Sequence, residues 1–169
     1  MHRVLFFIFV LCLNASTVHS AIIVDIEADS GWWTINYDDR GEWEYSFQFR
    51  LQSAGILTVT DELAAGDVFA VRINDAEPFQ TAPPVNWSHD DWTTDCDFAA
   101  ADSRWSTGRW ELLPGAYLIS GFVLPVVYDF GSGALRVDTL PVPAPATSLL
   151  LAGALGLCLA VRRSSSLCC

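Results

Sequence analysis

Apolar and polar residues alternate along several short segments of the chain, as they do in β-strands that bury one face. The alternation is strict over residues 43–51, where every second side chain is apolar. The segments that show the pattern are 22–27, 43–51, 56–60, 67–73, 116–124 and 134–139. The faces that we expect to be buried carry Trp43, Tyr45, Phe47, Phe49 and Leu51, then Leu57 and Val59, then Phe69, Val71 and Ile73.

Turn-forming pairs separate these segments, with Gly66-Asp67 before one strand and Pro114-Gly115 before another. Short strands with one buried and one wet face are typical of antiparallel sheets that pack on each other. No long amphipathic helix competes with this pattern between the chain's two ends. The sequence therefore predicts an all-β fold, a jelly-roll-like antiparallel β-sandwich, in one domain over residues 21–140.

The N-terminus has the layout of a secretory signal peptide. Met1-His2-Arg3 is positively charged, residues 4–13 are apolar, and Val18-His19-Ser20 precedes Ala21 as a cleavage site. We expect cleavage between Ser20 and Ala21, which removes residues 1–20 and exports the domain that follows.

The C-terminal segment, residues 141–169, has the parts of a membrane anchor. Residues 146–161 are apolar and uncharged, and they predict a single transmembrane helix. Pro143 and Pro145 keep the helix from beginning earlier, and Arg162 and Arg163 end it. Because positive charge stays in the cytoplasm, the domain at 21–140 is expected outside it.

Pro143-Ala144-Pro145, the apolar helix and Arg162-Arg163 together resemble the PEP-CTERM sorting signal of Gram-negative bacteria. The resemblance implies tethering in the inner membrane and processing by an exosortase-like enzyme. Where the tail is cleaved, it implies release to the cell surface or the exopolysaccharide matrix. Ala144 stands where the family usually has Glu, so the resemblance does not decide whether the exosortase-like enzyme cleaves this tail.

The strand-and-turn segments at 57–61, 66–71, 112–119 and 133–137 resemble extracellular bacterial β-sandwich modules. Such modules include the kind found at the C-termini of secreted peptidases. The resemblance implies an accessory or attachment role without catalytic machinery.

Charge narrows the choice of partners. All 20 acidic residues follow the predicted signal peptide, and the formal net charge of the chain is −11. An acidic surface repels a phosphate backbone, so nucleic acid is excluded as a partner. A neutral sugar polymer, a cationic partner or a calcium-rich surface fits this charge.

Residues 74–103 contain no convincing strand, and connections of this length are usually functional or disordered. Two hypotheses explain the aspartates in this segment. Calcium binds six to eight oxygens, so the carboxylates could form a calcium site, the one cofactor that the sequence suggests. Solvated turns and helix caps explain the same residues without a metal. The candidate ligands are Asp90, Asp91, Asp95 and Asp97.

The same segment carries Trp87 and Trp92, two of the seven tryptophans of the chain. Exposed tryptophans beside carboxylates bind sugars, because the ring meets C–H groups while the acids accept hydroxyl protons. Core filling is the alternative role for these rings. We take Trp87 and Trp92 as the candidate ligand-binding residues.

Catalytic motifs are missing from the sequence. It has no Gly-x-Ser-x-Gly and no His-Glu-x-x-His, and His89 is the only histidine of the exported domain. Cys96 is the only cysteine there, which excludes a disulfide within the domain and leaves a buried inert thiol or a bond between chains. We therefore expect a structural, adhesive or carbohydrate-binding protein. The alternative is a secreted hydrolase that acts on polysaccharide or ester through His89 or an acidic pair.

Overall fold

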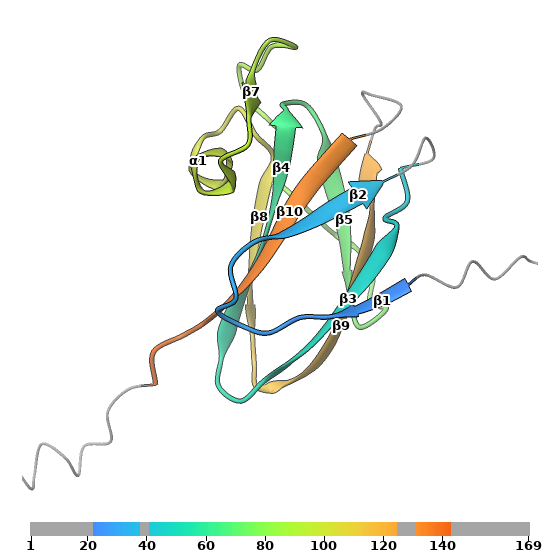
Figure 1. Cartoon of the computed structure of the whole chain (residues 1–169), viewed down its shortest axis with the longest axis vertical. Helices are drawn as coiled ribbons and strands as arrows, with labels where there is room; N and C mark the ends of the chain where they lie inside the picture. The colour runs from blue at the N-terminus through green and yellow to red at the C-terminus, as the bar shows by residue number, and fades with distance from the viewer. Residues whose placement is uncertain (1–21, 38–40, 125–130, 143–169) are drawn as a thin grey trace, which may run out of the picture.

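The computed structural model describes residues 22–37, 41–124 and 131–142, which form two β-sheets packed face to face (Figure 1). The predicted signal peptide, and the predicted sorting tail from residue 143 on, lie outside these residues, so both remain predictions. Within the described residues no helix is long and apolar enough to span a bilayer.

Each sheet draws its strands from distant parts of the chain. The first has the order β1-β3-β9-β5-β6, with bounds Ile22–Asp25, Tyr45–Leu51, Gly115–Leu124, Val68–Ile73 and Phe79–Gln80. The second has the order β2-β10-β4-β7, with bounds Trp33–Tyr37, Gly131–Thr139, Gly55–Ala64 and Trp92–Thr93. Strand β8, Thr107–Leu112, also pairs with β4, and the short helix α1 spans Cys96–Ala101.

The predicted all-β sandwich is confirmed, with one correction to its antiparallel character. Strand β1 pairs in parallel with β3, with Ile22 opposite Tyr45. The chain leaves the first sheet after β1, forms β2 in the second sheet, and returns as β3, so the two neighbours point the same way. The other pairings between named strands are antiparallel.

The core lies between the sheets, and the predicted inward faces supply most of it. Leu57, Val59 and Phe69 are fully buried, whereas Tyr45 and Ile73 are only partly buried at its rim. The ring of Phe69 meets the rings of Tyr37 and Trp43 edge to face, with centroids 6.2 Å away in both cases. Burying such large apolar side chains is the main force that holds the sheets together.

The sandwich has two distinct ends. Strand β10 pairs with β4 from Ser132 opposite Glu62 to Thr139 opposite Gly55, which spans about 23 Å at the usual strand rise. Strand β7 pairs with β4 beyond Glu62, whereas residues 140–142 continue past Thr139. Figure 1 accordingly shows β7 and α1 at the upper end, while the chain after β10 leaves at the lower left.

Candidate functional site

Residues 74–103, hereafter the aromatic loop, are ordered by contacts with both sheets. The loop contains β6, β7 and α1. Backbone amides of Thr81, Ala82 and Val85 donate to the carbonyls of Phe69, Thr107 and Ser103 at 2.8–3.0 Å. The hydroxyl groups of Thr81 and Ser106 also share one hydrogen bond inside the protein. The start of the loop therefore closes one side of the sandwich.

Trp87 is a packing residue at the base of the aromatic loop. Its ring is partly buried against a small cluster formed by Ala65, Ala99 and Trp105. It also lies on Gly66, whose φ is +139° and where an added Cβ would come within 2.8 Å of the ring. Only glycine combines that backbone conformation with so close an approach. The turn between β4 and β5 is thus a seat for Trp87.

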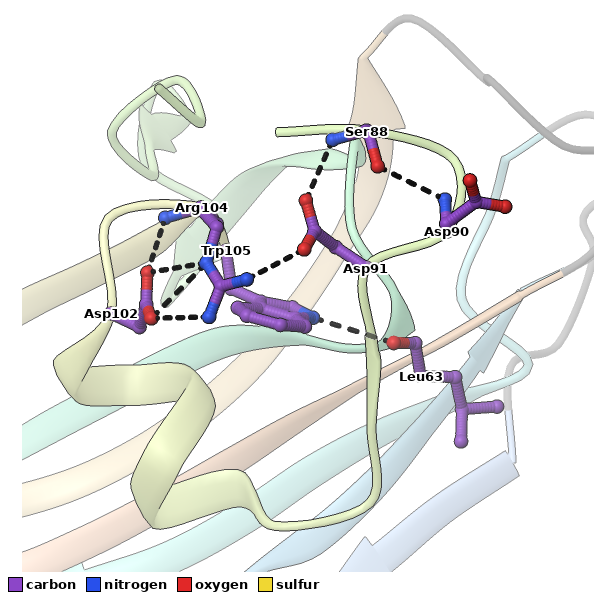
Figure 2. Close-up of polar contacts among 7 residues, drawn as sticks. All are labelled: Leu63, Ser88, Asp90, Asp91, Asp102, Arg104 and Trp105. Atoms are coloured by element: carbon purple, nitrogen blue, oxygen red, sulfur yellow. Dashed lines mark hydrogen bonds and ion pairs between the residues drawn. The ribbon is translucent and has the colours of Figure 1, made fainter. Parts of the chain in front are cut away.

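Arg104 organises the middle of the loop (Figure 2). Its guanidinium donates to Asp91 at 2.6 Å and to both carboxylate oxygens of Asp102 at 2.8–3.2 Å. The same group lies over the rings of Trp105 and Phe98, at 5.0 and 5.9 Å from their centroids. The hydrogen bonds from Arg104 hold the pKa of Asp102 below its usual range.

Helix α1 is fixed at its first turn. Asp95 is the N-cap, with its side chain accepting the Phe98 amide at 3.0 Å, and this confirms the helix-cap interpretation for that residue. The next acidic residue, Asp97, accepts from Trp32 at 3.1 Å and from Arg136 of β10 at 2.6 Å. These two hydrogen bonds, Trp32 first, lower the pKa of Asp97. Arg136 in turn stacks 4.5 Å over the Trp32 ring.

The four aspartates considered as calcium ligands do not share one site. Asp91 pairs with Arg104, Asp95 caps α1 and Asp97 pairs with Arg136. Figure 2 shows Asp90 turned away from Asp91, with its amide donating to the Ser88 hydroxyl at 3.2 Å. Among the residues that the structure describes, no three histidine, cysteine, aspartate or glutamate side chains are grouped to hold a metal ion.

The two candidate ligand-binding tryptophans lie in different surroundings. Trp92 is 63% exposed on β7, where it pairs through the backbone with Ala64, while Trp87 is packed against the seat described above. His89 is exposed and meets the Trp87 ring edge-on at 5.1 Å. Of the two rings, Trp92 is therefore the more accessible to solvent.

A buried pair of carboxyl groups, Asp61 and Asp67, escaped the sequence analysis. They are 0% and 2% exposed. Asp61 accepts amide hydrogen bonds from Glu62, Gly66 and Asp67 at 2.9–3.1 Å, and the Tyr37 hydroxyl donates to Asp67. The alternation of Leu57 and Val59 places Asp61 on the inward face of the strand. This position in the sequence was the one indication that Asp61 is buried. Buried in this way, the pair has no contact with a polymer at the surface.

Burial raises the pKa of Asp61 to about 8, with the charge of Asp67 adding to the effect and the amide donors opposing it. On the opposite face of β4, burial also raises the pKa of Glu62, which accepts hydrogen bonds from Cys96 and Ser132. The thiol of Cys96, a free cysteine, has its pKa raised to about 11 by burial and then by Glu62. It therefore stays protonated and unreactive at neutral pH.

Comparisons with known proteins give only distant matches among solved structures. No family model matches the sequence, and the search of curated proteins gives no match. Among solved structures, the chain is similar to the pre-peptidase C-terminal domain of collagenase from Bacillus anthracis, at 13% identity and a TM-score of 0.39. The match covers 69% of this chain and 94% of that domain. A likeness at that level says nothing about function.

Proposed function

We propose that this protein is an exported, membrane-tethered module of the bacterial envelope or exopolysaccharide matrix, with an adhesive, carbohydrate-binding role. In this proposal the sandwich is a jelly-roll-like ectodomain. Residues 1–20 are a signal peptide, and residues 141–169 are a sorting signal with a transmembrane helix at 146–161. An exosortase-like enzyme processes the tail. The proline motif, apolar run and arginine pair of the sequence support this part.

The observation that carries the binding role is the exposure of Trp92 on a braced loop. A tryptophan that is 63% exposed offers a wide apolar face to the C–H groups of a sugar ring. The ion pairs of Arg104 and the cap at Asp95 hold the surrounding backbone in place before any ligand arrives. A preordered loop loses less entropy on binding than a mobile one.

The direction in which Trp92 is presented supports a role away from the membrane. The described chain ends at Val142, past one end of β10, whereas β7 lies at the other end of the β4–β10 pair (Figure 1). A protein tethered through residues that follow Val142 therefore extends Trp92 outward by the length of the sandwich. That placement suits contact with a surrounding polymer.

The ligand that fits best is a neutral or amino-sugar polysaccharide. Asp91, Asp97 and Asp102 are paired with arginines, whereas the Asp90 carboxylate is turned outward two residues before Trp92. A carboxylate in that position accepts hydrogen bonds from sugar hydroxyl or ammonium groups. It repels a polyuronate.

The binding test is retention of the full-length protein, in detergent, on matrix polysaccharide. Trp92→Ala is expected to abolish retention, whereas Phe79→Ala, which removes an exposed ring from β6, is expected to leave it unchanged. A chelator is expected to have no effect. Unchanged retention of Trp92→Ala would contradict the binding role. Mass spectrometry of the native protein tests sorting, and an intact C-terminus through Cys169 in the extracellular fraction would exclude cleavage.

A further inference from the structure

The buried Asp61–Asp67 pair lies directly beneath the seat of the aromatic loop. We propose that the pair holds one proton, carried by Asp61, and acts as a latch, which keeps the β4–β5 turn in place under Trp87 and frees the loop more readily once that proton is lost. The consequence for sugar binding rests on the proposed function, whereas the latch itself does not.

A short chain of contacts connects the carboxyl pair to the loop. The Asp61 carboxyl group accepts the amides of Gly66 and Asp67, at 2.9 and 3.1 Å, so it fixes the backbone of the turn. The same turn holds the loop from its outer side, because Gly66 carries the Trp87 ring and the Ala65 amide donates to the Asp91 carbonyl at 3.1 Å. A movement of the β4–β5 turn is therefore expected to move Trp87 with it.

The surroundings of the pair favour one protonated and one charged carboxyl group over two negative charges. Two carboxylates with almost no exposure repel each other strongly in a medium of low dielectric constant. Within the described residues, Asp67 is the only charged side chain that contributes to the raised pKa of Asp61. Burial and the neighbouring carboxyl group raise the pKa of Asp61, so the proton is assigned to Asp61, while the Tyr37 hydroxyl donates to Asp67.

The other titratable groups around the pair face elsewhere or are neutralised. Glu62 follows Asp61 in β4 and points to the opposite face, toward Cys96 and Ser132. Ser106, the residue before strand β8, meets Asp61 through its carbonyl, which accepts the Asp61 amide at 2.8 Å. The Asp91 carboxylate above the turn is paired with Arg104.

Opening of the loop becomes more favourable as the pH rises, because the closed and opened forms bind different numbers of protons. In the closed loop the pKa of Asp61 is about 8, whereas a hydrated aspartate has a pKa near 4. Between these two values the opened form binds fewer protons, so opening becomes roughly tenfold more favourable for each pH unit. Below about 4 and above about 8 both forms carry the same protons, and the effect levels off. The loop is held most firmly in acid.

Hydrogen exchange read by mass spectrometry tests the latch on the full-length protein in detergent. The quantity compared is exchange of the peptide covering residues 83–95, in the natural protein and in Asp61→Asn at the same pH. Because intrinsic exchange at one pH is the same for both proteins, their ratio isolates the opening. We expect this ratio to rise roughly tenfold per pH unit from pH 5 to 7. Asp25→Asn, on the exposed edge strand β1, should behave like the natural protein.

A ratio that does not change between pH 5 and 7 would overturn the latch. If Asp61→Asn does not fold, Asp67→Asn serves as the second variant, because it removes the same charge pair. In the natural protein alone, an opening constant that does not change with pH, after correction for intrinsic exchange, also overturns the proposal. No ligand enters the measurement. A failed polysaccharide assay would therefore refute the binding role and leave the latch standing.

Discussion

Phe69 in the core and Trp87 in the aromatic loop are both packed aromatic residues, but different forces hold their surroundings. Phe69 lies among apolar side chains from both sheets, including the rings of Tyr37 and Trp43. Trp87 lies in a segment fixed by the Arg104 ion pairs, a helix cap and a glycine turn. Ion pairs of this kind weaken as the salt concentration rises, so we expect the loop to open more readily than the core.

Within the loop, Trp87 and Trp92 make a second contrast. They are five positions apart and share the same acidic neighbourhood in the sequence, yet one ring is seated on Gly66 and the other is 63% exposed. Trp87 therefore supports the loop, whereas ligand contact is proposed for Trp92. Substitutions in the core and in the loop test the first contrast, and the reactivity of the two tryptophans tests the second.

The largest effect is expected in the core. Phe69→Ala removes a fully buried ring and should lower the free energy of unfolding by about 3–5 kcal/mol. Phe79→Ala, at a residue that is 46% exposed, should change it by less than about 0.5 kcal/mol. Urea unfolding followed by far-ultraviolet circular dichroism measures both. Equal losses in the two variants would refute the division between core and surface.

A smaller effect is expected at the seat of the loop. Gly66→Ala adds a methyl group against the Trp87 ring at a positive φ, and we expect a cost of about 1–3 kcal/mol. Gly31→Ala is the matched control, since Gly31 has φ +90° and nothing within 4 Å of an added Cβ. The excess cost at Gly66 measures the Trp87 contact, with proteolysis within residues 83–95 as a second readout. If both variants lose the same stability, Trp87 is not seated on this turn.

The sequence was sufficient to predict the core faces, because strand alternation has a period of two and a single register satisfies it. Leu57, Val59, Phe69 and Val71 all lie where that register places them. Asp61 lies on the same inward face. An alternation of apolar and polar residues does not predict burial of an aspartate, because its burial depends on three backbone amides that donate to it. The parallel β1–β3 pair was equally inaccessible, because it depends on which sheet the intervening β2 joins.

The loop's chemistry could not be read from the sequence, because its charge partners are remote. Asp97 pairs with Arg136, 39 positions later, and Asp91 with Arg104, 13 positions later. Without those arginines in view, a run of aspartates fits a calcium site as well as it fits an ion-pair network. Two contacts are local: Asp95 accepts the Phe98 amide three residues ahead, and Asp91 accepts the Ser88 amide three residues back. Only the cap and turn interpretation of these two residues could be made from neighbouring residues.

Oxidative footprinting of the two loop tryptophans, with and without matrix polysaccharide, tests most directly whether Trp92 contacts ligand while Trp87 supports the loop. Without polysaccharide, Trp92 should be oxidised much faster than Trp87, in line with their exposure. Adding polysaccharide should protect Trp92 and leave the rate at Trp87 unchanged. Protection of Trp87 alone, or of neither ring, would contradict the account.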